Sequence, residues 1–215
     1  MKKIKCLVTA GPTREHFDPV RFISNPSTGK MGWEIAAAAH KKGWETALVI
    51  GPSELPDIEG VDVKRVVSAQ DMLEECQKRF DSCDILIMSA AVSDVRPKIN
   101  LSQKAKKESI DFTPQLERTP DILLTLSQKK KNQILIGFAA ETEKLLEYAK
   151  TKLKQKNLDG IIANIVGKSG TGFASDTNKI DMILKSGEIV DFNEAAKSSL
   201  ARLVVNFLSA RFFEK

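Results

Sequence analysis

The chain has 215 residues, 42% of them hydrophobic and 28% charged, which is typical of a globular domain with a full core. It contains no apolar run near the ~20 residues of a membrane span, and its lysine-rich start lacks a signal-peptide core, so we expect a cytoplasmic protein without membrane contact. The net charge of +5 suits an enzyme of phosphorylated substrates or a nucleic-acid binder, and the three cysteines without a CxxC pair argue against a disulfide framework or a zinc site.

Short apolar runs alternate with helical patterns along most of the chain. Strands are expected at residues 4–10, 46–50, 63–67, 84–90, 133–138 and 160–166. Helices are expected at residues 30–42, 69–80, 121–131 and 143–156. This alternation predicts βαβ units and therefore a mostly parallel sheet.

The pattern changes after residue 178. Residues 179–185 and 188–192, joined by Ser186 and Gly187, predict a β-hairpin, and an amphipathic helix is expected from Asn193, a candidate N-cap, to about residue 213. The predicted fold is a single α/β domain over residues 1–215, with a Rossmann-like, mostly parallel sheet, flanking helices, a C-terminal β-hairpin and a final helix.

The loop between the first strand and the first helix is unusually long and polar. It reads TAGPTREHFDPVRFISNPSTGKMG over residues 9–32, whereas most such loops have about 2–6 residues. Hydroxyl, amide and glycine residues at a helix start can bind a phosphate, or they can serve as turn residues that bind their own backbone. We favour a phosphate site made by Ser24, Asn25, Ser27, Thr28 and Gly29.

Standard nucleotide and nucleophile motifs are absent. A GxGxxG fingerprint is missing after the first strand, and a P-loop would need glycine where the chain has Ser24. The chain has two histidines, His16 and His40, so a catalytic triad is poorly supported. His16 is either a substrate contact or a loop residue. No cluster of side chains predicts a metal site, although an Mg²⁺ ion bound to phosphates does not require such a cluster.

Further candidate residues follow later strands. Small residues at 90 and 91 allow a ligand to approach the backbone, and the carboxylate at 94 either accepts hydrogen bonds from a ribose or base or serves in a turn. The aromatic ring at 138 either stacks on a base or packs in the core. In the helix expected at residues 143–156, one face carries two apolar residues followed by two lysines, which could reach a polyphosphate. These residues are Ala90, Ala91, Asp94, Phe138, Leu145, Ala149, Lys152 and Lys156.

The segment from residue 95 to residue 118 loses hydrophobic periodicity. It is either an active-site flap or a solvated insertion, and Ile110 and Phe112 could alternate in a short strand.

Seven separated motifs then match one known family in order and spacing. GPTRE, DPVRFISNPSTGKMG, AAVSD, KAKK, PDIL, GFAAET and KNLDGIIAN resemble the phosphopantothenate–cysteine ligases of coenzyme A biosynthesis, over essentially the whole chain. The resemblance is to the stand-alone bacterial form, without a flavin-dependent decarboxylase domain. It implies that CTP and Mg²⁺ activate the carboxylate of 4'-phosphopantothenate as an acyl-CMP, which L-cysteine converts to an amide with release of CMP. ATP is the alternative nucleotide.

The resemblance also implies roles for individual residues. Asn25 would engage the acyl-nucleotide intermediate, and Lys104 would contact the nucleotide from the flap. Other nucleotide contacts would be Asp94, Pro120, Asp121, Ile122, Leu123, Phe138, Lys152 and Lys156, with Ala90 and Ala91 lining the same cleft. Family members are homodimers, with the region after the fifth strand at the interface.

Two other classes remain as alternatives. A nucleotide-dependent oxidoreductase would consume reduced nicotinamide, but the chain lacks GxGxxG. A basic nucleic-acid-binding module would show salt-dependent binding, but the chain has only 6% aromatic residues and no stacking platform. We therefore expect no nucleic-acid partner.

Overall fold

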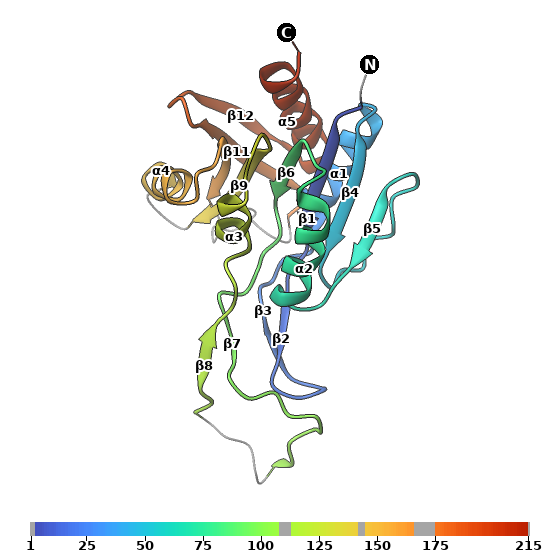
Figure 1. The fold of residues 1–215 in the computed structure, drawn as a ribbon, viewed down its shortest axis with the longest axis vertical. Helices are drawn as coiled ribbons and strands as arrows, with labels where there is room; N and C mark the ends of the chain where they lie inside the picture. Colours follow the sequence, from blue (N-terminus) through green and yellow to red (C-terminus); the bar gives the residue numbers. More distant parts are fainter. Residues whose placement is uncertain (1–2, 108–112, 142–144, 166–174, 215) are drawn as a thin grey trace.

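A twisted eight-stranded sheet forms the centre of the computed structural model, which describes residues 3–107, 113–141, 145–165 and 175–214 (Figure 1). The strand order is β12-β11-β10-β9-β6-β1-β4-β5, and every pair from β10 to β5 is parallel. The strands are β1 (Lys5–Ala10), β4 (Glu45–Ile50), β5 (Asp62–Arg65), β6 (Ile85–Met88), β9 (Ile134–Glu141), β10 (Gly160–Ile165), β11 (Thr177–Leu184) and β12 (Ile189–Ala196). The predicted mostly parallel α/β sheet is confirmed.

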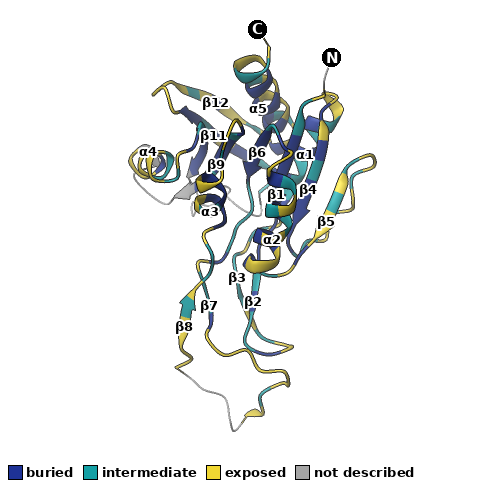
Figure 2. Ribbon diagram, in the orientation of Figure 1, coloured by how far each residue is buried: buried dark blue, intermediate teal, exposed yellow. Residues whose placement is uncertain are grey.

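Helices cover both faces of this sheet. On one face α1 (Lys30–Lys41) packs beside α5 (Lys197–Phe212), and the other face carries α2 (Ala69–Phe80), α3 (Ile122–Gln128) and α4 (Leu145–Gln155). Each face of the sheet carries a hydrophobic core, and strand β1 contributes side chains to both. Val8 packs on the face covered by α1 and α5, and Leu7 packs on the opposite face. The central strands are therefore buried on both faces, as their continuous apolar runs predict (Figure 2).

Helix α2 has the boundaries that its sequence predicts. The Ser68 side chain accepts from the backbone N–H of Asp71, and the Asp71 carboxylate accepts from the backbone N–H of Ser68. This capping box satisfies two helix-start donors and explains the start at Ala69.

The predicted start of the last helix is wrong. Asn193 lies within β12, and α5 begins at Lys197 after Ala196, whose side chain makes no capping bond. Pairing of β12 with β11 continues to Ala196, opposite Thr177. The ladder hydrogen bonds therefore override the capping preference of Asn193.

Two short hairpins form an arm that projects beyond the sheet, a feature that the sequence did not predict. In one, β2 (Arg14–His16) pairs with β3 (Phe22–Ser24), and in the other β7 (Val95–Pro97) pairs with β8 (Leu116–Arg118) (Figure 1). The predicted flap therefore begins and ends in a β-ladder. The proposed strand at Ile110 and Phe112 lies outside the described residues. Within the described residues, no helix is long and apolar enough to cross a membrane.

Candidate active site

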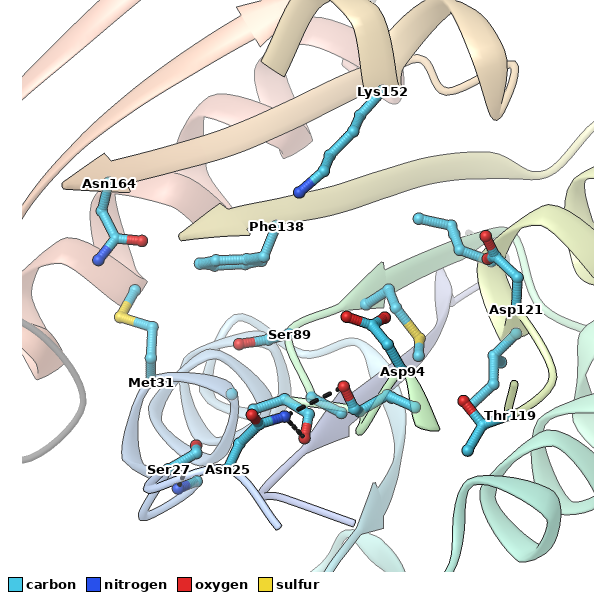
Figure 3. Close-up of a pocket in the computed structure, with 18 of the residues that line it drawn as sticks. Asn25, Ser27, Met31, Ser89, Asp94, Thr119, Asp121, Phe138, Lys152 and Asn164 are labelled. Atoms are coloured by element: carbon cyan, nitrogen blue, oxygen red, sulfur yellow. Dashed lines mark hydrogen bonds between the residues drawn. The ribbon is translucent and has the colours of Figure 1, made fainter. Parts of the chain in front are cut away.

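A cleft of about 900 Å³ lies across the carboxyl ends of the parallel strands. Its walls come from the loop before α1, the loop after β6, the start of α3, β9, α4, β10, β11 and the start of α5 (Figure 3). Open parallel sheets bind ligands at this edge. Most of the predicted residues line the cleft: Asn25, Ser27, Thr28, Gly29, Ala90, Ala91, Asp94, Pro120, Asp121, Ile122, Leu123, Phe138, Lys152 and Lys156.

The loop before α1 reaches the cleft through a tight, glycine-dependent turn. Gly29 caps α1 with φ 82°, a left-handed conformation that favours glycine. The Ser27 hydroxyl accepts from the Gly29 N–H at 3.3 Å, and the Thr28 hydroxyl accepts from the Lys30 N–H at 3.4 Å. The hydroxyls thus bind their own backbone here, at a helix start that also faces the cleft.

Asn25 joins the two loops that form the floor of the cleft. Its side-chain Nδ2 donates to the carbonyl oxygens of Ala91 at 3.0 Å and Val92 at 3.1 Å. Both N–H bonds of this amide are therefore directed at the backbone. Its Oδ1 atom is the group that can accept from a ligand.

Ser24 lies beside the cleft but does not line it. Its hydroxyl donates to the Thr13 carbonyl at 2.8 Å, so Ser24 holds the β2–β3 hairpin together. His16 also has a structural place, with Nδ1 3.1 Å from the Asp18 carbonyl and its ring 5.2 Å from the ring of Phe22. Neither residue contacts the cleft in this structure.

Two carboxylates occupy the α3 side of the cleft. The exposed side chain of Asp94 points into it (Figure 3), while its backbone carbonyl accepts from the Thr119 N–H at 3.1 Å. Asp121 caps α3 by accepting from the Leu124 N–H at 3.0 Å and also binds Lys156 at 2.9 Å. Asp94 is therefore the better placed of the two to bind a ligand hydroxyl or amine.

The predicted lysine face of α4 is present, with Ala149 buried and Lys152 half-buried above the cleft. Lys152 extends toward the ring of Phe138, which lies in the middle of the cleft wall (Figure 3). Lys156 is also half-buried but is neutralised by Asp121, whereas Lys150 and Lys154 are exposed. The side chain of Leu145 lies outside the described residues.

Sequence reasoning missed one end of the cleft, formed by Met31, Asn164, Asn178 and Lys197. Asn164 is the next-to-last residue of β10, so its polar side chain after an apolar run was a usable signal. Asn178 and Lys197 gave no such signal, because only the antiparallel pairing of β11 brings its first residues to this edge. Asn164 Nδ2 donates to Asn178 Oδ1 at 3.4 Å.

This end of the cleft is cationic. Lys197 is only 3% exposed, and burial together with the nearby Lys30 charge lowers the pKa of its ammonium, an effect that Asp176 opposes. Lys30 Nζ lies 2.6 Å from Asp176 Oδ1, and this bond raises the pKa of Lys30. Positive charge at a helix start suits an anionic ligand.

Lys104 lies on the arm and does not line the cleft. It lines a second hollow with Arg21, Ala105, Lys106 and Lys107. Among the described residues, no three histidine, cysteine or acidic side chains gather as metal ligands. A magnesium ion carried by phosphates requires only one or two carboxylates, and Asp94 and Asp121 line the cleft.

Comparison with known proteins places this architecture in a family. Residues 1–211 match the family described as DNA/pantothenate metabolism flavoprotein C-terminal domain. This chain belongs to that family. The resemblance that the motifs carry is thereby confirmed.

The curated relatives of this chain include CoaBC proteins of named organisms. The chain is 48% identical over 182 residues to the Coenzyme A biosynthesis bifunctional protein CoaBC of Bacillus subtilis (strain 168), covering 84% of this chain and 45% of that protein. The Borreliella burgdorferi CoaBC is 40% identical over 211 residues, covering 97% and 53%. The chain therefore spans about half the length of these relatives.

A solved structure agrees with the fold over the whole chain. The crystal structure of the C-terminal domain of CoaBC superposes with a TM-score of 0.84 and 39% identity, covering 100% of this chain and 98% of that one. The mostly parallel sheet with its C-terminal hairpin and helix is thus the fold of this family.

Proposed function

We propose that this chain is a phosphopantothenate–cysteine ligase of coenzyme A biosynthesis. The observation that carries the proposal is the cleft itself, in which Asn25, Asp94 and Phe138 come together from three separate loops and strands. A relative with 48% identity is named as a coenzyme A biosynthesis protein, which supports the same reaction.

The proposed reaction has two steps. The carboxylate of 4'-phosphopantothenate attacks the α-phosphorus of CTP. The bond between this phosphorus and the oxygen that bridges to the β-phosphate breaks, pyrophosphate departs, and an acyl-CMP is formed. The amine of L-cysteine then attacks the acyl carbon, the bond to CMP breaks, and an amide forms as the ammonium proton is lost. Both nucleophiles come with the substrates, so the protein supplies orientation and charge stabilisation.

The cleft offers groups suited to each part of the nucleotide. Asp94 accepts hydrogen bonds from ribose or base, and the Phe138 ring provides a face for the base. The helix start at Ser27, Thr28 and Gly29 faces the phosphates, near the ammonium groups of Lys30 and Lys197. Lys152 adds charge from α4.

Two further assignments rest on the family resemblance. CTP is proposed as the nucleotide, with ATP as the alternative. Mg²⁺ is proposed as the ion that would neutralise its phosphates; phosphate oxygens would supply most of its ligands, and Asp94 or Asp121 could add a carboxylate. Lys104 lies on the arm, so its nucleotide contact is likewise proposed from the resemblance.

Assembly and location are proposed on the same basis. We expect a cytoplasmic homodimer without nucleic-acid or membrane partners. The fifth strand expected from the sequence is β9 in the structure, and residues 142–144, which follow it, lie outside the described residues. Light scattering after size exclusion tests the dimer, since a mass near that of one chain would contradict it.

Product analysis tests the proposed reaction. The protein is incubated with 4'-phosphopantothenate, L-cysteine, Mg²⁺ and each nucleoside triphosphate in turn, and the products are examined by mass spectrometry. We expect the amide of phosphopantothenate with cysteine, together with CMP in the CTP reaction. Absence of that amide with every nucleotide would contradict the proposal.

A further inference from the structure

Asp18 is a buried carboxylate on the projecting arm, in the turn between β2 and β3. Its side chain is 2% exposed, although the next two residues, Pro19 and Val20, are exposed. Its Oδ1 atom accepts from the backbone N–H groups of Val20 and Arg21, both at 2.8 Å. These two bonds close the turn.

The second oxygen of Asp18 reaches a distant part of the sequence. Oδ2 accepts from the Arg21 guanidinium at 2.6 Å and from the backbone N–H of Ala105 at 3.2 Å. The Arg21 guanidinium also lies 3.5 Å from the Ala105 carbonyl. Asp18 and Arg21 therefore hold both backbone polar groups of Ala105, the residue next to Lys104.

A backbone contact strengthens the same junction. The Leu101 N–H donates to the Phe17 carbonyl at 2.8 Å. Residues 101–107, here named the Lys104 segment, are thus attached to the β2–β3 turn at two places. A loop of this composition has no hydrophobic periodicity of its own to hold it there.

Charge explains why a carboxylate is needed at this junction. The hollow beside the turn gathers the cationic side chains of Arg21, Lys104, Lys106 and Lys107. Like charges repel, and an ionised carboxylate among them offsets part of that repulsion. Burial alone would raise the pKa of Asp18, but hydrogen bonds from Val20, Arg21 and Ala105 lower it to about 2. Asp18 is therefore ionised at neutral pH.

We propose that Asp18 is a positioning residue that attaches the Lys104 segment to the β2–β3 turn and so sets where Lys104 can meet the nucleotide. The proposal rests on the proposed function, in which Lys104 contacts the nucleotide. Asp18 acts through Lys104 and does not itself touch a substrate.

The first test compares Asp18→Asn with Asp57→Asn. The control removes another carboxylate that binds an arginine, since Asp57 Oδ1 lies 2.7 Å from Arg65 on an exposed surface away from the arm. We expect Asp18→Asn to lower kcat/KM for the nucleotide about 10- to 100-fold, because misplaced catalytic groups cost about that much, while KM for cysteine is unchanged. Equal activity of the two variants would overturn the proposal.

A double-mutant cycle tests the route through Lys104. Lys104→Gln is expected to abolish most nucleotide-dependent turnover, and adding Asp18→Asn should then change the residual rate by less than about twofold. If the double variant loses activity by the product of the two single-variant factors, the proposal is overturned, because Asp18 would then act independently of Lys104.

A measurement without substrates separates this proposal from the proposed function. In Asp18→Asn we expect faster hydrogen exchange at Ala105 and faster tryptic cleavage after Lys104, with neither change in Asp57→Asn. If the wild-type protein has no ligase activity, the proposed function is wrong, and the attachment of the Lys104 segment by Asp18 is judged by hydrogen exchange alone. Unchanged exchange at Ala105 would overturn it.

Asp18→Glu provides a second variant should Asp18→Asn fail to fold. It keeps the charge and moves it by one methylene, so it should retain the fold while weakening the bond to Ala105. A hydrogen-exchange rate at Ala105 between those of the wild-type protein and Asp18→Asn supports the proposed attachment. A wild-type exchange rate with wild-type activity overturns it.

Discussion

Asn25 connects two loops through its amide. Replacing it by Asp would place a carboxylate oxygen against the Ala91 and Val92 carbonyls, which now accept from Nδ2 at 3.0 and 3.1 Å. We expect Asn25→Asp to lower kcat about 10²-fold, because repulsion between the carboxylate and these carbonyls would shift the two loops and misplace the groups that line the cleft. Steady-state kinetics with circular dichroism as a fold check measures this. A wild-type rate would remove Asn25 from the site.

Asp18 gives the arm a defined response to acid. Its pKa is lowered from 3.8 to about 2, so its stabilising contribution is full above pH 4 and is lost as the pH falls toward 2. We expect the wild-type protein to be more stable to urea than Asp18→Asn above pH 4, with the difference disappearing near pH 2. A difference that persists to pH 2 would contradict this.

At the scale of elements, the placement of α1 depends on a glycine in its first turn. A Cβ atom at Gly32 would lie 2.7 Å from Ala10 Cβ and 2.8 Å from the Thr9 carbonyl. Helix α1 therefore approaches β1 closely, and this approach positions the helix start that faces the cleft.

Gly32→Ala tests that packing. Helix propensity alone would stabilise the variant by ~1 kcal/mol. We expect the opposite sign, a loss of ~1–3 kcal/mol, because the added methyl group overpacks the contact with β1. Urea unfolding gives the answer, and a stabilised variant would show that α1 can shift without cost.

The regular elements were predictable because each carries its own signal. Strand β1 is apolar on both faces, and α2 has Ser68 three residues before Asp71, so periodicity and capping agree. The arm hairpins have strands of only three residues, too short to show a period of two. The misplaced start of α5 has another cause, since pairing with β11 decides where β12 ends.

The candidate site was predictable where residues follow parallel strands directly. Asp94 and Phe138 were found from strand ends, and Asn25 from the polar loop before a helix. Lys197 and Asn178 reach the cleft only through the antiparallel hairpin, which tertiary structure arranges. The Asp18 contact with Ala105 joins residues 87 positions apart, and no local pattern encodes it.

At the scale of the whole molecule, the sheet brings loops from distant parts of the chain to one edge. The loop before α1 and the loop after β6 meet at the cleft because parallel strands end together there, and the β11–β12 hairpin brings the start of α5 to the same edge. The described residues that line the cleft thus offer polar and cationic groups and no histidine, which fits the proposed reaction, because both of its substrates carry their own nucleophiles.

Pyrophosphate release tests this account most directly. The protein is mixed with 4'-phosphopantothenate, Mg²⁺ and CTP, without cysteine, and pyrophosphate is measured before and after cysteine is added. We predict a burst of about one pyrophosphate per active site, as expected for an accumulated intermediate, followed by continuous release once cysteine is present. The account would be contradicted if no pyrophosphate appeared with CTP, ATP or any other nucleoside triphosphate.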